Sequence, residues 1–276
     1  MTDEEKLKKL RKRIFVTAYK NGITHLASAY SSLEIMYVLY MKGLISSGDA
    51  ALGSRNQDRF ILSKGHAAIA LYAVLEEAGL LKTRELDTFL KSGTRLGGEP
   101  CRRDLDLIET STGSLGHGIT VATGMAIAQK VDDLNARTFC LIGDGESEEG
   151  TVWEAAMSAV SFKLNNLTVI LDHNHLQKNY EVSNFLGKTK WNEKWDAFGW
   201  NVKEVDGHDI QAIYKALAEP ADTERPTIII ANTIKGKGVS IMENNFKWHF
   251  RMPNRKELKR FMEELDISEE EILEGV

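Results

Sequence analysis

The sequence predicts an α/β fold with a doubly wound, mostly parallel sheet and helices on both faces. Short apolar runs of strand length alternate with segments whose apolar residues recur every three or four positions, as along one face of a helix. Strands that alternate with helices are typical of parallel sheets. The 276 residues contain no low-complexity linker or internal repeat, so we expect one domain over 1–276.

The beginning of the chain is predicted to be helical. An amphipathic helix is expected over 3–20, which opens with acidic residues and then carries one apolar face: Leu7, Leu10, Ile14 and Ala18. Further helices are expected over 32–40 and 66–78, the second ending near Gly79, a residue common at helix ends. An N-terminal helical extension is therefore predicted over about residues 1–50.

The remainder alternates between the two types of element. The glycine-rich segment after Thr112 predicts a small-residue helix that can pack closely on a sheet. Strands are expected in four runs: RTFCLIGDG, LTVILDHN, GWNVKEVDGHD and RPTIIIANTI. One helix is expected near 210–218 and another over 151–164, whose apolar residues recur at helical spacing: Trp153, Met157, Val160 and Leu164. A charged helical tail is predicted over about residues 254–276.

Composition excludes several classes of protein. Hydrophobic residues make up 42% of the chain and charged residues 27%, as in ordinary globular proteins. A net charge of -5 without a basic stripe argues against a nucleic-acid surface. Cys101 and Cys140 match no metal-site spacing and are expected to be reduced. No signal segment and no long apolar stretch is present, so we expect a cytoplasmic protein that does not bind membranes.

The segment IGDGESEEG, residues 142–150, is rich in negative charge where a strand passes into a helix. The glycines beside Asp144 let a ligand approach the backbone, and amides at a helix start suit a phosphate. Asp144 alone would repel phosphate, but Mg²⁺ between the carboxylate and a diphosphate removes the conflict. Asn174, after the next strand, can supply a second oxygen and a later carbonyl a third. Alternatively, GDG is only a tight turn and Asn174 a capping residue.

Several ordered motifs extend this pattern over nearly the whole chain. GDG with Asn174, together with SKGHAAIALYAVLEEAGLL, STGSLGHGITVATGMAIA, WDAFGWNVKEVDGHD and TIKGKGVSIMENN, resembles segments of transketolases. The resemblance implies the thiamine-diphosphate-binding fold, with thiamine diphosphate and Mg²⁺ as cofactors. It also implies transfer of a two-carbon ketol or acyl unit from a ketose or 2-oxo acid to an aldehyde or ketone.

The resemblance assigns roles to individual residues. Asp144 and Asn174 would bind Mg²⁺ through their side chains, and Leu176 through its carbonyl. The Gly145 amide would bind the diphosphate. The other matched positions, which lie against the cofactor or approach its diphosphate or reaction centre, are Gly113, Leu115, His66 and Lys235.

Three histidines match catalytic positions of the family: His25, His66 and His249. Two-carbon transfer moves protons among carbonyl and hydroxyl oxygens, and imidazole titrates near neutral pH. Taken singly, each histidine is better explained as a surface or core residue. Their joint match favours catalytic roles, least firmly for His25, which lacks the surrounding glycines and proline.

The resemblance covers only the N-terminal part of a transketolase, as in enzymes split into two subunits. In this family, the glutamate that activates the aminopyrimidine belongs to a following pyrimidine-binding domain. A partner chain would therefore carry that glutamate, in an α2β2 heterotetramer. Glu149 matches the family glutamate at the contact between the two active-site halves. Glu146 and Glu148 receive no role beyond a favourable position in the first turn of a helix.

Departures from the family pattern cluster around the substrate side. Glu99 stands where transketolases have the histidine of GHP, which contacts the donor, and HLASAYSS replaces a glycine-rich loop. Other unusual residues are His117, Lys178 and Phe250. We expect retained cofactor chemistry and a changed substrate: an unphosphorylated, deoxy or nucleotide-linked sugar, or pyruvate. The alternatives are the α subunit of a 2-oxo acid dehydrogenase and a non-catalytic regulatory subunit.

Overall fold

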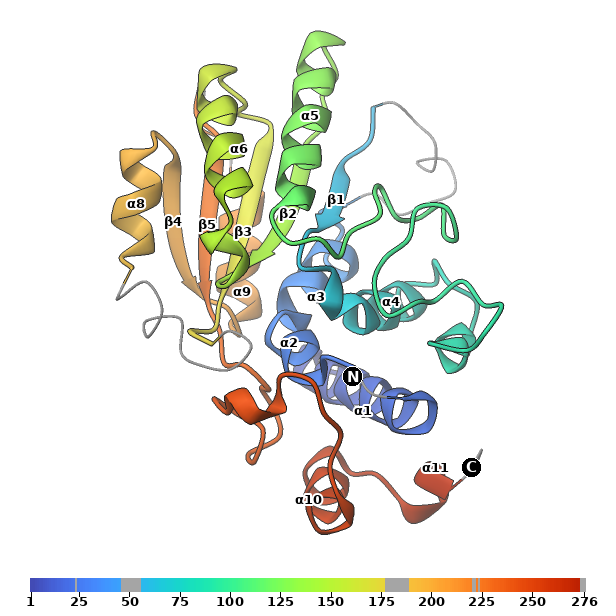
Figure 1. The fold of residues 1–276 in the computed structure, drawn as a ribbon. Helices are drawn as coiled ribbons and strands as arrows, with labels where there is room; N and C mark the ends of the chain where they lie inside the picture. Colours follow the sequence, from blue (N-terminus) through green and yellow to red (C-terminus); the bar gives the residue numbers. More distant parts are fainter. Residues whose placement is uncertain (23, 46–55, 177–188, 220–221, 223, 274–276) are drawn as a thin grey trace.

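The computed structural model describes residues 1–22, 24–45, 56–176, 189–219, 222 and 224–273. Its centre is a five-stranded parallel sheet with the strand order β1-β2-β3-β5-β4 (Figure 1). The strands are β1 (Arg59–Leu62), β2 (Thr138–Gly143), β3 (Leu167–His173), β4 (Asn201–Asp206) and β5 (Thr227–Asn232). The predicted parallel α/β architecture is confirmed.

Helices cover both faces of the sheet (Figure 1). One face carries α5 (His117–Val131), α6 (Gly150–Ser161) and α8 (Trp191–Ala197). The core on the other side gathers the remaining helices: α1 (Asp3–Asn21), α2 (Leu26–Ser31), α3 (Leu33–Met41), α4 (Ala68–Glu77), α9 (Ile210–Ala218), α10 (Arg255–Leu265) and α11 (Glu269–Leu273). Successive strand residues feed opposite cores, because side chains alternate across a strand: Phe139 joins one and Cys140 the other.

The N-terminal helix begins where the sequence predicts. Thr2 and Glu5 form a reciprocal capping box, in which the Thr2 amide donates to Glu5 at 2.7 Å and the Glu5 amide donates to Thr2 at 3.2 Å. The apolar face predicted for 3–20 is buried. It packs against α10, where the rings of Phe15 and Phe261 stack with centroids 4.7 Å apart. The two ends of the described chain therefore contribute to one core.

The predicted face of helix 151–164 is wrong. Met157 is 56% exposed, and Trp153 and Val160 are only partly buried. The buried face of α6 instead consists of small residues and one valine: Val152, Ala155, Ala156 and Ala159. Small side chains permit the close approach of α6 to α5 and the sheet, and this close approach outweighs the larger apolar surface of the other face.

Three short elements were not predicted from the pattern: β1, α2 and α8. The run RFIL in β1 has only four residues, too few to show a period, and its strand structure depends on pairing with β2. Cys140 is buried in β2 and Cys101 partly exposed, and both thiols are free. Among the described helices, none combines the length and hydrophobicity that crossing a bilayer requires.

Candidate active site

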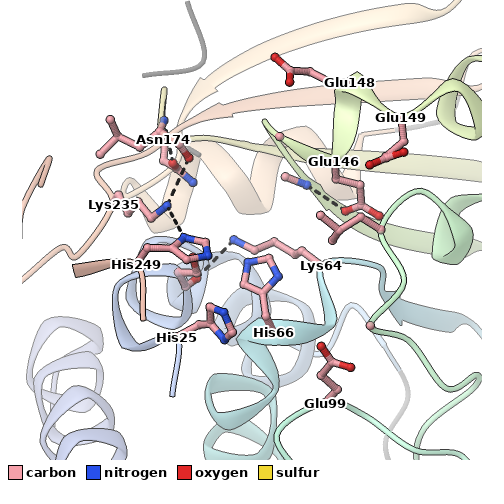
Figure 2. Close-up of a pocket in the computed structure, with 16 residues that line it drawn as sticks. His25, Lys64, His66, Glu99, Glu146, Glu148, Glu149, Asn174, Lys235 and His249 are labelled. Carbon is pink, nitrogen blue, oxygen red and sulfur yellow. Dashed lines mark hydrogen bonds between the residues drawn. The ribbon is translucent and has the colours of Figure 1, made fainter. Parts of the chain in front are cut away.

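A cavity of about 430 Å³ opens at the carboxyl ends of the strands, where parallel sheets bind ligands (Figure 2). Its lining comes from segments far apart in the chain: His25, Ser28, Lys64, His66, Glu99, Gly113, Leu115, Gly143, Gly145, Glu146, Glu148, Glu149, Asn174, Leu176, Lys235 and His249. Every predicted site residue lines this cavity except Asp144, which lies buried between two lining glycines. The tertiary structure thus brings the predicted set together.

The predicted metal-binding segment lies between two paired strands. β2 and β3 are neighbours with Gly143 opposite Asp172, so the residues that follow each strand meet at one edge. The Asp144 carboxylate lies 2.6 Å from His173 Nδ1 and accepts a hydrogen bond from the His175 amide at 2.6 Å. These contacts hold the carboxylate in one orientation next to Asn174.

Asn174 and Leu176 complete an oxygen-rich group. The Asn174 side-chain oxygen accepts the Leu176 amide at 3.1 Å, so the alternative role as a local turn residue is also observed. The Leu176 carbonyl accepts a hydrogen bond from the Lys235 ammonium at 3.3 Å. A positively charged group therefore already contacts one of the three expected metal ligands.

This group fits a hard divalent cation. One carboxylate, one amide oxygen and one backbone carbonyl are ligands that Mg²⁺ accepts together with phosphate oxygens. Within the described residues, no cluster of three or more His, Cys, Asp or Glu side chains is arranged to hold a metal. A site of the zinc type is thus not formed by these residues, whereas the mixed oxygen set suits a metal that shares a diphosphate.

Beneath the cavity lies a buried ion pair that the sequence did not reveal. Lys64 and Asp172 contact each other, with side chains 1% and 0% exposed. Asp172 also accepts hydrogen bonds from Ser31 at 2.6 Å, from Thr233 and from Asn174 at 3.2 Å. Asp172 therefore joins the segments that carry Lys64, Asn174 and Lys235. A hydroxyl, an amide and an ammonium around one aspartate have no signature in the linear sequence.

The three histidines gather on one wall (Figure 2). The ring centroid of His25 lies 5.0 Å from that of His66 and 4.9 Å from that of His249. Removal from water lowers the pKa of His66 well below its ordinary value, and the nearby charge of Lys64 lowers it further. His66 is therefore a neutral ring at neutral pH, able to donate one hydrogen bond and accept another.

Lys235 lies at the junction of the histidines and the metal-binding segment. Its ammonium nitrogen is 3.2 Å from His249 Nδ1. Burial, followed by the charge of Lys64, lowers the pKa of Lys235 to about 8, although Asp172 and Asp144 oppose the shift. Lys235 therefore remains mostly protonated at neutral pH and places a positive charge where a diphosphate is expected.

Glu146, which had no role in the sequence interpretation, is a buried acceptor at the centre of three loops. Its carboxylate accepts hydrogen bonds from the Gly116 amide at 2.9 Å, the Gly143 amide at 3.2 Å and the Ser63 hydroxyl. These donors belong to the TGSLG loop, the end of β2 and the end of β1. Its structural role corrects the expectation of a solvent-facing residue in the first turn of a helix.

Glu148 and Glu149 lie at the other rim. One Glu148 carboxylate oxygen is buried and receives no hydrogen bond within the described part of the chain. Burial and the charge of Asp144 raise the pKa of Glu148. Glu149 is exposed, and its Cβ packs so close to Gly116 that a side chain there would lie 2.9 Å away. Glu149 therefore remains accessible to another chain.

The unusual residues occupy different places. Glu99 lies on the wall below His66 in Figure 2, and a Cβ added at Gly113 would collide with its carboxylate. Phe250 lies against His25, with ring centroids 4.7 Å apart. His117 is exposed at the start of α5, with Nδ1 3.0 Å from the Leu115 carbonyl oxygen. Lys178 lies outside the described residues.

The sheet and its cavity define the class: an α/β domain that binds a phosphorylated cofactor at the carboxyl ends of its strands. The family described as "Transketolase, thiamine diphosphate binding domain" matches residues 8–272. The chain therefore belongs to the transketolase family, through its thiamine diphosphate binding domain, and is a transferase of the transketolase type.

Individual relatives agree with this assignment. One of the two chains of an apulose-4-phosphate transketolase from Phocaeicola vulgatus is 36% identical over 96% of this chain and 94% of the relative. A 6-deoxy-6-sulfo-D-fructose transketolase subunit from a Clostridium species is 36% identical over 87% of each chain. Human transketolase is 40% identical over 83% of this chain, which spans only 36% of that enzyme.

A solved structure has the same fold. Transketolase from Leishmania mexicana superimposes with a TM-score of 0.82 at 26% identity, over 96% of this chain and 45% of that one. The predicted thiamine-diphosphate-binding fold is thereby confirmed. Relatives named as subunits also indicate that enzymes of this type are divided between chains.

Proposed function

We propose that this chain is the diphosphate-binding subunit of a split transketolase-like enzyme that transfers a two-carbon unit between sugars. The observation that carries the proposal is the single cavity where the Asp144, Asn174 and Leu176 oxygens lie near three clustered histidines. Its working location is the cytoplasm. The relatives that this chain covers almost completely are named transketolase subunits, which supports a divided enzyme.

The metal-binding segment and the cavity floor would hold the cofactor. Asp144, Asn174 and the Leu176 carbonyl would bind Mg²⁺, while the Gly145 amide and the Lys235 ammonium would contact the diphosphate. The TGSLG loop, with Gly113 and Leu115, would lie against the body of the cofactor. Bound thiamine diphosphate would supply the nucleophilic carbon and accept electrons from the broken carbon–carbon bond.

The histidines would manage the protons of the substrate. A neutral His66 can accept a hydroxyl proton at one ring nitrogen while its other nitrogen donates a hydrogen bond. His25 and His249 lie close enough to contact the same small substrate. The wall of rings also keeps water from part of the cavity. These groups therefore position the donor and acceptor and move protons between oxygens.

A partner chain would complete the site. We propose that it carries a pyrimidine-binding domain and the glutamate that activates the aminopyrimidine, in an α2β2 assembly. Support comes from the exposed Glu149 at the cavity rim, which is available to a second chain. The buried Glu146 cannot take that role, because its carboxylate is occupied by three donors of its own chain.

Reconstitution tests this function. The chain should be combined with a candidate C-terminal half of a split transketolase and assayed with thiamine diphosphate, Mg²⁺ and a panel of ketose donors. We expect ketol transfer that requires both chains and is abolished by EDTA. Cofactor binding without carbon–carbon cleavage of any ketose or 2-oxo acid would favour a regulatory subunit. Activity that depends on a lipoyl group would favour a 2-oxo acid dehydrogenase.

Glu99 is proposed to select the donor. Its carboxylate faces the cavity without a hydrogen bond from a described residue, so it can accept hydrogen bonds from donor hydroxyls and repel donor anions. This charge favours a hydroxylated ketose over a 2-oxo acid such as pyruvate. The relatives named for apulose 4-phosphate and sulfofructose act on unlike sugars, which supports a family in which substrate choice varies.

Neutralising Glu99 is expected to change the order of donors. In Glu99→Gln, kcat/KM for anionic hydroxypyruvate relative to neutral erythrulose should rise roughly three- to tenfold, because a repulsion between like charges in a water-accessible site is lost. Steady-state kinetics of the assembled enzyme measure this ratio. Glu154→Gln, which removes an exposed carboxylate on α6 outside the cavity, is the matched control. An unchanged ratio in Glu99→Gln would remove Glu99 from donor selection.

A further inference from the structure

Residues 233–238, the segment TIKGKG after β5, carry Lys235 into the cavity and are held by their backbone on both sides of it. The Ile234 amide, immediately before Lys235, donates to His208 Nε2 at 2.8 Å. The Gly236 amide, immediately after it, donates to the Ala27 carbonyl at 3.0 Å. The Lys237 carbonyl accepts a hydrogen bond from Arg11 Nε at 2.9 Å. The course of this segment thus depends on side chains from elsewhere in the fold.

Arg11 and Glu34 form a buried ion pair behind the cavity. Arg11 from α1 and Glu34 from α3 are 7% and 3% exposed, and Arg11 Nη2 contacts Glu34 Oε1. Burial would raise the pKa of Glu34, but the charge of Arg11 and the contact with His208 outweigh it and lower the pKa. The carboxylate is therefore ionised, and neither residue lines the cavity.

His208 connects this pair to the segment. Because His208 Nε2 accepts the Ile234 amide, the proton of a neutral ring must lie on Nδ1. That Nδ1 is 3.2 Å from Glu34 Oε1, although the two are not aligned as a good hydrogen bond. The carboxylate thus favours the tautomer in which Nε2 can accept the amide. An acidic residue that orients a histidine is a familiar arrangement around functional groups.

Stability alone is a weak reason for this arrangement. A buried ion pair commonly adds little to stability compared with apolar residues of the same size. Glu34 Oε2 is buried and receives no hydrogen bond from the described residues. The segment is nevertheless shaped around Arg11: Gly238 has φ +96°, and a Cβ there would lie 2.7 Å from Arg11 Cδ.

We propose that Arg11, Glu34 and His208 form a clamp that positions Lys235 for the cofactor. The clamp holds the backbone at Ile234 and at Lys237, so that the ammonium between them meets the Leu176 carbonyl and His249 Nδ1. These three are positioning residues, since they touch neither the cavity nor any expected substrate. The inference rests on the proposed function, in which Lys235 contacts the diphosphate.

Two variants test the clamp in the assembled enzyme. Glu34→Gln can donate to Nδ1 and stabilise the wrong tautomer, and His208→Leu removes the acceptor of the Ile234 amide. Both are expected to speed amide hydrogen exchange in 233–238 before cofactor is added, and to raise the Kd for thiamine diphosphate with Mg²⁺ about tenfold, as loss of a supporting residue typically does. Exchange in β2 should remain unchanged.

Rescue and control variants separate positioning from general destabilisation. His208→Gln keeps a side-chain oxygen for the Ile234 amide and should restore most of the affinity. Arg13→Gln breaks an ion pair of the same helix with Glu76, away from the segment, and should change neither measurement. Faster exchange with an unchanged Kd, or no rescue by His208→Gln, would overturn the clamp. A wild-type assembly that binds no thiamine diphosphate would overturn the proposed function itself.

Discussion

Replacing Asp144 by alanine is expected to abolish Mg²⁺-dependent binding of thiamine diphosphate. The variant removes the only carboxylate of the proposed metal ligands and leaves the amide of Asn174 and the Leu176 carbonyl as neutral oxygens. We expect the Kd to rise more than ~100-fold, beyond the 10- to 100-fold typical of residues that only support a ligand. Isothermal titration of the assembled enzyme with thiamine diphosphate, in Mg²⁺ and in EDTA, measures the loss.

Asp144→Asn is the matched control for folding. It keeps an oxygen that can accept the His175 amide, which Asp144 accepts at 2.6 Å, but removes the negative charge. Both variants should therefore lose metal-dependent binding, while Asp144→Asn should unfold at nearly the wild-type temperature. If Asp144→Ala folded and still bound the cofactor with wild-type affinity in Mg²⁺ but not in EDTA, the metal assignment would be wrong.

Replacing Asp172 by alanine is expected to cause the largest loss of stability. The substitution leaves the Lys64 ammonium, only 1% exposed, without its carboxylate, and removes the acceptor of Ser31 and Thr233. Breaking a buried ion pair from one side typically costs about 3–5 kcal/mol of the free energy of unfolding. Urea unfolding followed by circular dichroism measures this difference.

The comparison for Asp172→Ala is an ion pair at the surface. Lys163 and Glu224 are 3.0 Å apart with side chains 60% and 65% exposed, so Glu224→Ala should cost less than about 1 kcal/mol. The double variant Lys64→Met with Asp172→Ala should recover part of the loss, because no buried charge is then left alone. Equal costs for Asp172→Ala and Glu224→Ala would contradict the structural role of the buried pair.

Asp172 also makes stability depend on pH. Burial would raise its pKa, but Lys64 and the hydrogen bonds from Lys64, Ser31 and Thr233 lower it below the ordinary value of 3.8. A lowered pKa in the folded state stabilises the protein above the pKa of the unfolded state. This contribution is lost as the pH falls below about 4 and through the lowered pKa. Asp172→Ala should lack this part of the acid transition.

Much of the fold follows from local pattern. The alternation of apolar runs with helical periods predicted the four later strands, and the capping residues predicted the start of α1 within one residue. The face of α6 was predicted wrongly, since periodicity ranks residues by hydrophobicity whereas close packing selected its alanines. The four-residue β1 was missed because its structure depends on pairing with a strand about 80 residues away, Arg59 lying opposite Thr138.

The membership of the site was predictable, but its support was not. GDG, Asn174 and the histidine motifs indicated the cavity residues, because cofactor ligands occur at fixed positions beside strand ends. The charge in ESEEG was ambiguous: only the structure shows that Glu146 is buried among three loops while Glu149 is exposed. Neighbouring glutamates in one turn point in different directions, so composition cannot assign their roles.

By itself, the sequence determined the parallel α/β architecture, the transketolase family and the cavity residues that match its motifs. Those features are encoded by local periodicity and by residue types at short, fixed spacings. The tertiary structure alone decided which charges are buried and which partners they have: Lys64 with Asp172, and Arg11 with Glu34 and His208. Such partners are far apart in the chain, and a buried charge is stabilised only by groups that the completed fold brings within contact distance.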